Sequence, residues 1–174
     1  MTQYVAFLGG VNVGGHRVSM ERLRAEMRSI GLEDARTFIA SGNVIFTARA
    51  APAMLETRIE QHLGEQLGYA VPTFVRTARA VTSAAARDPF GDVPATDSQY
   101  VVFLRRAPTA GEKQATVALA NPRDRFELHG RELHWLVHGK LMDSGVKPAA
   151  LAKALGQPST TRNVTSLRKL VAAL

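Results

Sequence analysis

The chain has 174 residues, a hydrophobic fraction of 45%, a net charge of +7 and no cysteine. The length suits one ordinary domain or two small subdomains, and the hydrophobic fraction argues against a disordered chain. The absence of cysteine excludes disulfide and thiolate chemistry, and no apolar run approaches the ~20 residues that span a bilayer, so we expect a cytoplasmic protein.

The first half of the chain predicts the order strand, helix, strand, strand, helix, strand. The N-terminal apolar run lacks a preceding basic region, so it indicates a strand and not a signal peptide. Ser19 and Gly31 suit the two ends of the first helix, and Pro52 and Gly68 suit those of the second. We expect strands over 3–8, 35–40, 43–48 and 71–75, with helices over 20–30 and 52–67. This order is the ferredoxin-like split βαβ motif.

The second half repeats the pattern after a Pro/Gly/Asp-rich boundary at 88–98. Thr109 and Glu112 have the spacing of a capping box. After helix 77–87 we expect strands over 99–104, 125–129 and 132–137, and helices over 109–120 and 148–155. No final strand is predicted, because a helix with Asn163 as its N-cap follows. The predicted fold is α+β, with ferredoxin-like subdomains over 1–92 and 97–174, the second incomplete and ending in a C-terminal helix.

A glycine-rich stretch, FLGGVNVGGHR, follows the first predicted strand over Phe7–Arg17. In a P-loop frame, Gly10–Gly15 is followed by His16 and Arg17, so the lysine and the magnesium-binding hydroxyl are absent, and no G-x-G-x-x-G occurs. The loop therefore either brings backbone close to a ligand or makes a tight bend. Its candidate ligand residues are Asn12, Gly14 and Gly15.

A polar turn, Ser41-Gly42-Asn43, joins the two strands of the predicted hairpin. The first and third strands of a split βαβ sheet are neighbours, so this turn should lie beside the glycine-rich loop. Ser41 and Asn43 either stabilise the turn through their own backbone or contact a ligand as well. Backbone N–H groups at such an edge favour anions.

The stretch TTRNVTSLRKL begins the predicted C-terminal helix. Thr161, Arg162 and Asn163 would place free N–H groups and a guanidinium at a helix start, which favours an anion, whereas plain capping beside a surface arginine is the alternative. Residues 131–174 carry seven Lys/Arg against two acidic residues. Such a surface attracts phosphates, nucleic acid or acidic partners, or only solubilises the protein.

Metal and nucleophile patterns are weak in this sequence. His134 and His138 would lie ~13 Å apart along one strand, and no H-E-x-x-H occurs. Ser41 and His16 could approach each other, but the G-x-S-x-G pattern is absent. The third strand carries one aromatic residue, Phe46, and does not match the RNA-recognition signature. We expect no metal and no cofactor, and the sequence specifies no reaction type.

Three segments together resemble a bacterial family, the domain-of-unknown-function family 1697. They are FLGGVNVGGHRVSMERLR, RTFIASGNVIF and TTRNVTSLRKL, and the resemblance runs from Tyr4 to Leu170. It implies two ferredoxin-like halves and no established activity. Family members often have Arg where this chain has Gly9, and Trp where it has Val164. An anion contact made by that arginine would be absent here unless Arg17 supplies it.

The leading hypothesis is a cytoplasmic protein that binds a phosphate- or carboxylate-bearing small molecule. Its site would combine Asn12, Gly14, Gly15, Ser41, Asn43, Thr161, Arg162 and Asn163. Two alternatives stay open: a single-stranded nucleic-acid binder that uses the basic C-terminal third, and a non-catalytic protein-interaction module.

Overall fold

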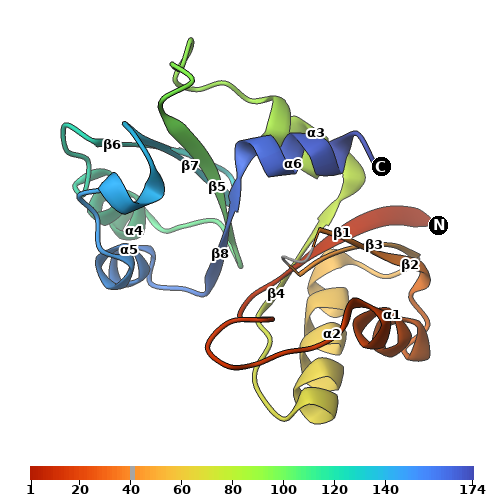
Figure 1. The fold of residues 1–174 in the computed structure, drawn as a ribbon. Coiled ribbons are helices and arrows are strands. Elements are labelled where there is room, and N and C mark those ends of the chain that lie inside the picture. Colours follow the sequence, from red (N-terminus) through yellow and green to blue (C-terminus); the bar gives the residue numbers. More distant parts are fainter. Residues whose placement is uncertain (40–41) are drawn as a thin grey trace. The chain divides into compact units, whose positions relative to one another are not determined.

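A computed structural model describes residues 1–39 and 42–174 of the chain. The chain divides into two compact units, Met1–Thr82 with Leu170–Leu174, and Ser83–Lys169. Each unit holds a four-stranded antiparallel sheet flanked by helices, so the α+β class is confirmed (Figure 1). In the part of the chain that is described, no helix is long and apolar enough to cross a membrane.

The first unit has the predicted element order. It contains β1 (Thr2–Leu8), α1 (Met20–Ser29), β2 (Glu33–Phe38), β3 (Asn43–Ala48), α2 (Pro52–Leu67), β4 (Thr73–Thr77) and the first part of α3 (Ala78–Ala86). The strand order is β2-β3-β1-β4. Ser19 caps α1 by accepting a hydrogen bond from the N–H of Arg22, and Gly68 ends α2 in the left-handed conformation, as the sequence predicts.

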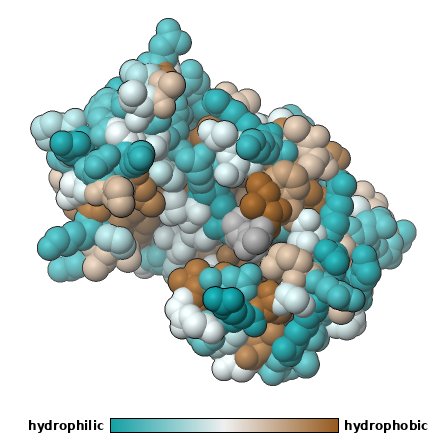
Figure 2. Space-filling view, viewed as in Figure 1, coloured by the Kyte–Doolittle hydropathy of each residue, from teal (hydrophilic) through white to brown (hydrophobic). Residues whose placement is uncertain are grey.

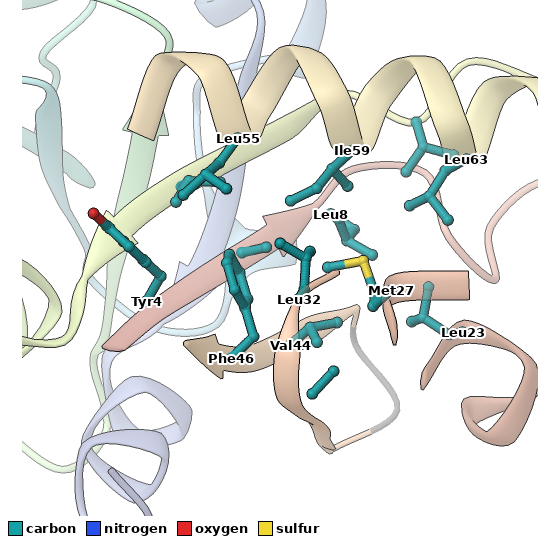
Figure 3. Close-up of a cluster of buried hydrophobic side chains, with 14 of the residues drawn as sticks. Tyr4, Leu8, Leu23, Met27, Leu32, Val44, Phe46, Leu55, Ile59 and Leu63 are labelled. Atoms are coloured by element: carbon teal, nitrogen blue, oxygen red, sulfur yellow. The ribbon is translucent and has the colours of Figure 1, made fainter. Parts of the chain in front are cut away.

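Helices α1 and α2 pack on one face of the first sheet. Leu55, Ile59 and Leu63 recur every four residues, so they form one stripe of α2, and all three are fully buried. Figure 3 shows this stripe above Phe46 of β3 and beside Met27 of α1. The apolar core fixes the sheet, and the ends of β1 and β3 therefore lie at defined positions.

The free edge of β4 is closed by two carboxylates of α2. Glu60 Oε1 accepts from the N–H of Thr73 at 2.7 Å, and Glu56 Oε1 accepts from the N–H of Val75 at 2.8 Å. Glu56 also forms a buried ion pair with Arg76, at 3.6 Å. An open sheet edge is a template for pairing with another strand, and these bonds remove that possibility along this part of β4.

The second unit contains the same order of strands and helices. After the last part of α3 come β5 (Ser98–Leu104), α4 (Ala110–Val117), β6 (Asp124–His129), β7 (Glu132–Val137), the 3-10 helix η1 (Leu141–Asp143), α5 (Pro148–Leu155), β8 (Ser159–Asn163) and α6 (Val164–Val171). The strand order is β6-β7-β5-β8. The predicted capping box between Thr109 and Glu112 is present.

The prediction that the second sheet is incomplete is wrong. Strand β8 pairs antiparallel with β5, and Thr161 and Arg162 lie within that strand and not at the start of a helix. The strand Ser-Thr-Thr-Arg-Asn is polar because it forms the sheet edge, so the alternation that marks a half-buried strand is missing. Asn163 does cap α6, since its Oδ1 accepts from the N–H of Thr165 at 2.8 Å.

A buried aspartate anchors the loop after β7. Asp124 is fully buried; its Oδ1 accepts from Trp135 Nε1 at 2.8 Å and Ser144 Oγ at 2.7 Å. Its Oδ2 accepts from the N–H of Gly145 at 2.7 Å and from Asn121 Nδ2 at 2.9 Å. Burial alone would raise the pKa of Asp124, but the four hydrogen bonds outweigh burial and lower it.

Candidate functional site

The glycine-rich loop is a turn between β1 and α1 that is closed by one side-chain hydrogen bond, which we call the clasp. Asn12 adopts the left-handed conformation with φ 61°, and its Oδ1 accepts from the N–H of Val18 at 2.8 Å. Val11 and Val18 are each only 6% exposed, so both ends of the turn are held by the core of the first unit. The clasp fixes the intervening residues as one compact loop.

The tip of this loop exposes backbone. Gly14 and Gly15 have φ of 63° and 90°, and no other residue lies within 4 Å of an added Cβ at either position. Within the described part of the chain, neither N–H group is hydrogen bonded. An open depression of about 460 Å³ is lined by Asn12, Arg17, Val18 and Ser19. This combination of free N–H groups and a guanidinium can bind an anion.

The hairpin turn lies beside the glycine-rich loop. The N–H of Leu8 donates to Gly42 O at 2.8 Å, and a Cβ on Gly42 would lie 3.6 Å from Val11 Cβ. Asn43 is 3% exposed and its Nδ2 donates to Phe38 O at 3.3 Å, so it stabilises the hairpin. Ser41 lies outside the described residues. The ligand contacts expected of Asn43 and Ser41 stay predictions.

Thr161, Arg162 and Asn163 belong to the second unit. Arg162 Nη1 donates to Thr160 Oγ1 at 2.8 Å and to Thr161 O at 2.9 Å. Burial lowers the pKa of Arg162 to about 10, which leaves it charged at neutral pH. The structure places these residues along β8 and at the start of α6. Their convergence with Asn12, Gly14 and Gly15 on one site stays a prediction.

Two clusters escaped the sequence analysis. His138 Nδ1 and Asp97 Oδ2 are 2.6 Å apart, and the N–H of Gly139 donates to Asp97 Oδ1. The hydrogen bond to His138 is the main reason why the pKa of Asp97 is lowered. A polar depression of about 440 Å³ is lined in part by Asp97 and Asn163. Forty-one residues separate Asp97 from His138, so no local pattern could have paired them.

The second cluster is a pocket between β8 and α5. It has a volume of about 280 Å³ and is lined by Trp135, Leu141, Val146, Pro148, Leu151, Ala152, Ser159 and Thr161. Trp135, Val146 and Leu151 are buried, whereas Leu141 is 46% exposed. The pocket is largely apolar, with two hydroxyls contributed by β8.

The surroundings of the histidines bear on the nucleophile and metal hypotheses, although Ser41, the nucleophile considered beside His16, lies outside the described residues. Ser29 Oγ and Glu26 Oε2 both contact Nε2 of His62, at 3.2 and 2.8 Å, so the ring cannot relay a proton from one to the other. His134 is 2% exposed, and burial lowers its pKa to about 4, whereas His138 bonds Asp97. Among residues 1–39 and 42–174, no group of three or more His, Asp or Glu could hold a metal.

Comparison with known proteins gives a family and a fold. A search of curated proteins finds no match. A solved structure of a conserved bacterial protein from Streptococcus pneumoniae is similar, with a TM-score of 0.78 and 22% identity, over 100% of this chain and 98% of that one. The sequence profile of the family described as "Protein of unknown function (DUF1697)" matches residues 1–134. The chain therefore belongs to the DUF1697 family of proteins of unknown function.

Proposed function

We propose that the protein binds an anionic small molecule, carrying a phosphate or a carboxylate, at the glycine-rich loop of the first unit. The observation that supports this proposal is the hydrogen bond of Asn12 with Val18, which holds Gly14 and Gly15 at an open surface, where their N–H groups bond no other described residue. Successive N–H groups in such conformations form a concave positive site for an oxyanion.

The neighbouring groups add to the positive potential. Arg17 is exposed and lines the same depression, and α1 begins two residues beyond Val18 with its N–H groups at that end. His16 stacks on Tyr69, with ring centroids 3.8 Å apart, which fixes the loop beside Arg17. In this proposal the backbone N–H groups and Arg17 hold the anion, and Asn12 shapes the loop.

The proposal also includes the topology of the two sheets, the bounds of the subdomains and the cellular location. The orders β2-β3-β1-β4 and β6-β7-β5-β8 support a ferredoxin-like description of each sheet. We also propose that residues 1–92 and 97–174 correspond to the two subdomains, and that the protein works in the cytoplasm. Thr161, Arg162 and Asn163 are proposed as a second anion-contact segment.

The test is a titration of the ¹⁵N-labelled full chain with inorganic phosphate and pyrophosphate at constant ionic strength. We expect saturable shifts of the Gly14 and Gly15 amide signals, with affinity reduced at least fivefold in Arg17→Gln. Arg49→Gln, an exposed arginine of the same unit, is the matched control for net charge and should bind normally.

Two outcomes contradict the proposal. Absence of a saturable shift at these glycines rules out the loop as an anion site, and an equal loss in both arginine variants shows diffuse electrostatics. A third arm uses a single-stranded oligonucleotide at low and raised salt. Tight binding that weakens steeply with salt would favour the nucleic-acid alternative instead.

A further inference from the structure

Strand β8 presents an open edge of the second sheet. The N–H of Leu104 donates to Arg131 O at 2.9 Å, so Leu104 bonds toward β7 and the residue before it, Phe103, bonds toward β8. Bonding direction alternates along a strand, so Thr160 and Arg162 bond β5. The backbone N–H groups of Ser159 and Thr161 therefore point away from β5, as does Thr161 O, which accepts from Arg162 Nη1 at 2.9 Å.

The equivalent edge of the first unit is closed, and this one is not. On β4 the outward N–H groups of Thr73 and Val75 donate to carboxylates of α2. Helix α5, which has the corresponding position in the chain order, contains no acidic residue. In the described part of the chain, nothing accepts a hydrogen bond from the outward N–H groups of Ser159 and Thr161.

The apolar pocket lies directly beside this edge. Ser159 and Thr161, whose N–H groups are open, also line the pocket, together with Leu151 and Ala152 of α5. A strand paired with β8 would place every second side chain on the side of the sheet that carries α5. One such side chain can enter the pocket and contact Trp135. A strand edge that can form hydrogen bonds and a pocket that can accept a side chain are the two parts of a β-strand addition site.

The chain segment that contributes most of the pocket lining is basic. Between residues 139 and 162 there are four Lys/Arg and one acidic residue, Asp143. The Asp143 carboxylate already accepts from the N–H of Lys140 at 2.8 Å. Lys147 is the N-cap residue of α5 and Lys153 lies in its last turn, and both are exposed. The charge therefore favours an acidic occupant.

We propose that β8 is a docking site for an extended acidic segment of a partner protein, which adds as a fifth strand and inserts one apolar side chain into the pocket. A second copy of this chain is a poor occupant. Its β8 reads Ser-Thr-Thr-Arg-Asn, so it offers no apolar anchor for the pocket and would add like charges. This proposal is independent of the anion site at the glycine-rich loop, because that loop belongs to the other unit; it shares β8 with the second anion-contact segment.

The test selects ligands from a phage-displayed library of random decapeptides on the immobilised full chain. Selected peptides should share one large apolar residue with acidic neighbours, and a synthetic copy should bind the chain in solution. Thr161→Pro removes the outward N–H, which an edge strand tolerates, and should weaken binding at least tenfold. Thr161→Val keeps the N–H and changes only the side chain in the pocket lining, so it should weaken binding much less than Thr161→Pro.

A second pair of variants tests the pocket and does not depend on proline being tolerated. Ala152→Phe fills the pocket and should weaken the same peptide at least tenfold, whereas Ala149→Phe, on an exposed part of α5 outside the pocket, should not. An unchanged far-ultraviolet circular dichroism spectrum and melting temperature verify folding, because Trp135 itself lines the pocket. The proposal fails if no peptide is selected, if binding survives Ala152→Phe, or if a single-stranded oligonucleotide but no peptide binds this edge.

Discussion

Replacement of Asp124 should strongly destabilise the second unit. The carboxylate is fully buried and accepts from four donors: the Trp135 indole, the Ser144 hydroxyl, the Gly145 N–H and the Asn121 amide. In Asp124→Asn, Oδ1 can still accept from Trp135 and Ser144. The new NH₂ group would face the Gly145 and Asn121 donors, which then lack an acceptor.

The magnitude follows from the number of orphaned donors. Each buried donor left without a partner costs about 1–3 kcal/mol, and neighbouring effects are not additive. With two such donors, Asp124→Asn should lower the free energy of unfolding by about 2–4 kcal/mol. Asp124→Ala orphans all four, but water enters the space that is left, so about 3–5 kcal/mol is expected. These losses are a large share of the about 5–15 kcal/mol that stabilises an ordinary protein.

The assay is urea unfolding followed by the fluorescence of Trp135, which is the only tryptophan of the chain and itself donates to Asp124. Asp143→Asn is the matched control, because this exposed carboxylate of the same loop accepts from one backbone N–H. It should cost at most about 1 kcal/mol. A loss below about 1 kcal/mol for Asp124→Asn would refute the reasoning that the network anchors the loop beneath the β8 pocket.

Two further predictions concern the hairpin and helix α4. Gly42→Ala should lower the free energy of unfolding by about 1–3 kcal/mol, because φ is 72° and the new Cβ would lie 3.1 Å from Leu8 O. Gly111→Ala, at an open position of α4, should be neutral or stabilising. Equal melting temperatures of the two variants would contradict this prediction. Glu112 forms a bidentate ion pair with Arg106, and the hydrogen bonds from Arg106 lower the pKa of Glu112 to about 2. A carboxyl group whose pKa is lowered on folding stabilises the folded state at pH values above its ordinary pKa. The difference in unfolding free energy between wild type and Glu112→Gln should therefore be full at pH 7 and shrink between pH 4.5 and 2. Urea unfolding at several pH values measures this difference, and a difference that stays constant down to pH 2 would show that Glu112 does not carry it.

Elements whose signals are local could be predicted from the amino-acid sequence. The four-residue repeat of Leu55, Ile59 and Leu63 and the terminal residues Pro52 and Gly68 specify α2, because helix formation and capping involve neighbours only a few residues apart. The proximity of the glycine-rich loop to the hairpin could also be predicted from the sequence, because the prediction required only the order of the first three strands. The loop's internal clasp did not, since several partners were equally available to Asn12.

Features that depend on distant partners became visible only in the folded chain. Strand β8 exists because β5 supplies its hydrogen bonds, and its own five polar residues carry no period that marks a strand. The closure of β4 by Glu56 and Glu60 joins residues more than ten positions apart, and so do three of the four hydrogen bonds on Asp124. A sequence read in short windows contains no record of such pairs, whereas burial makes their hydrogen bonds obligatory once the sheets have formed.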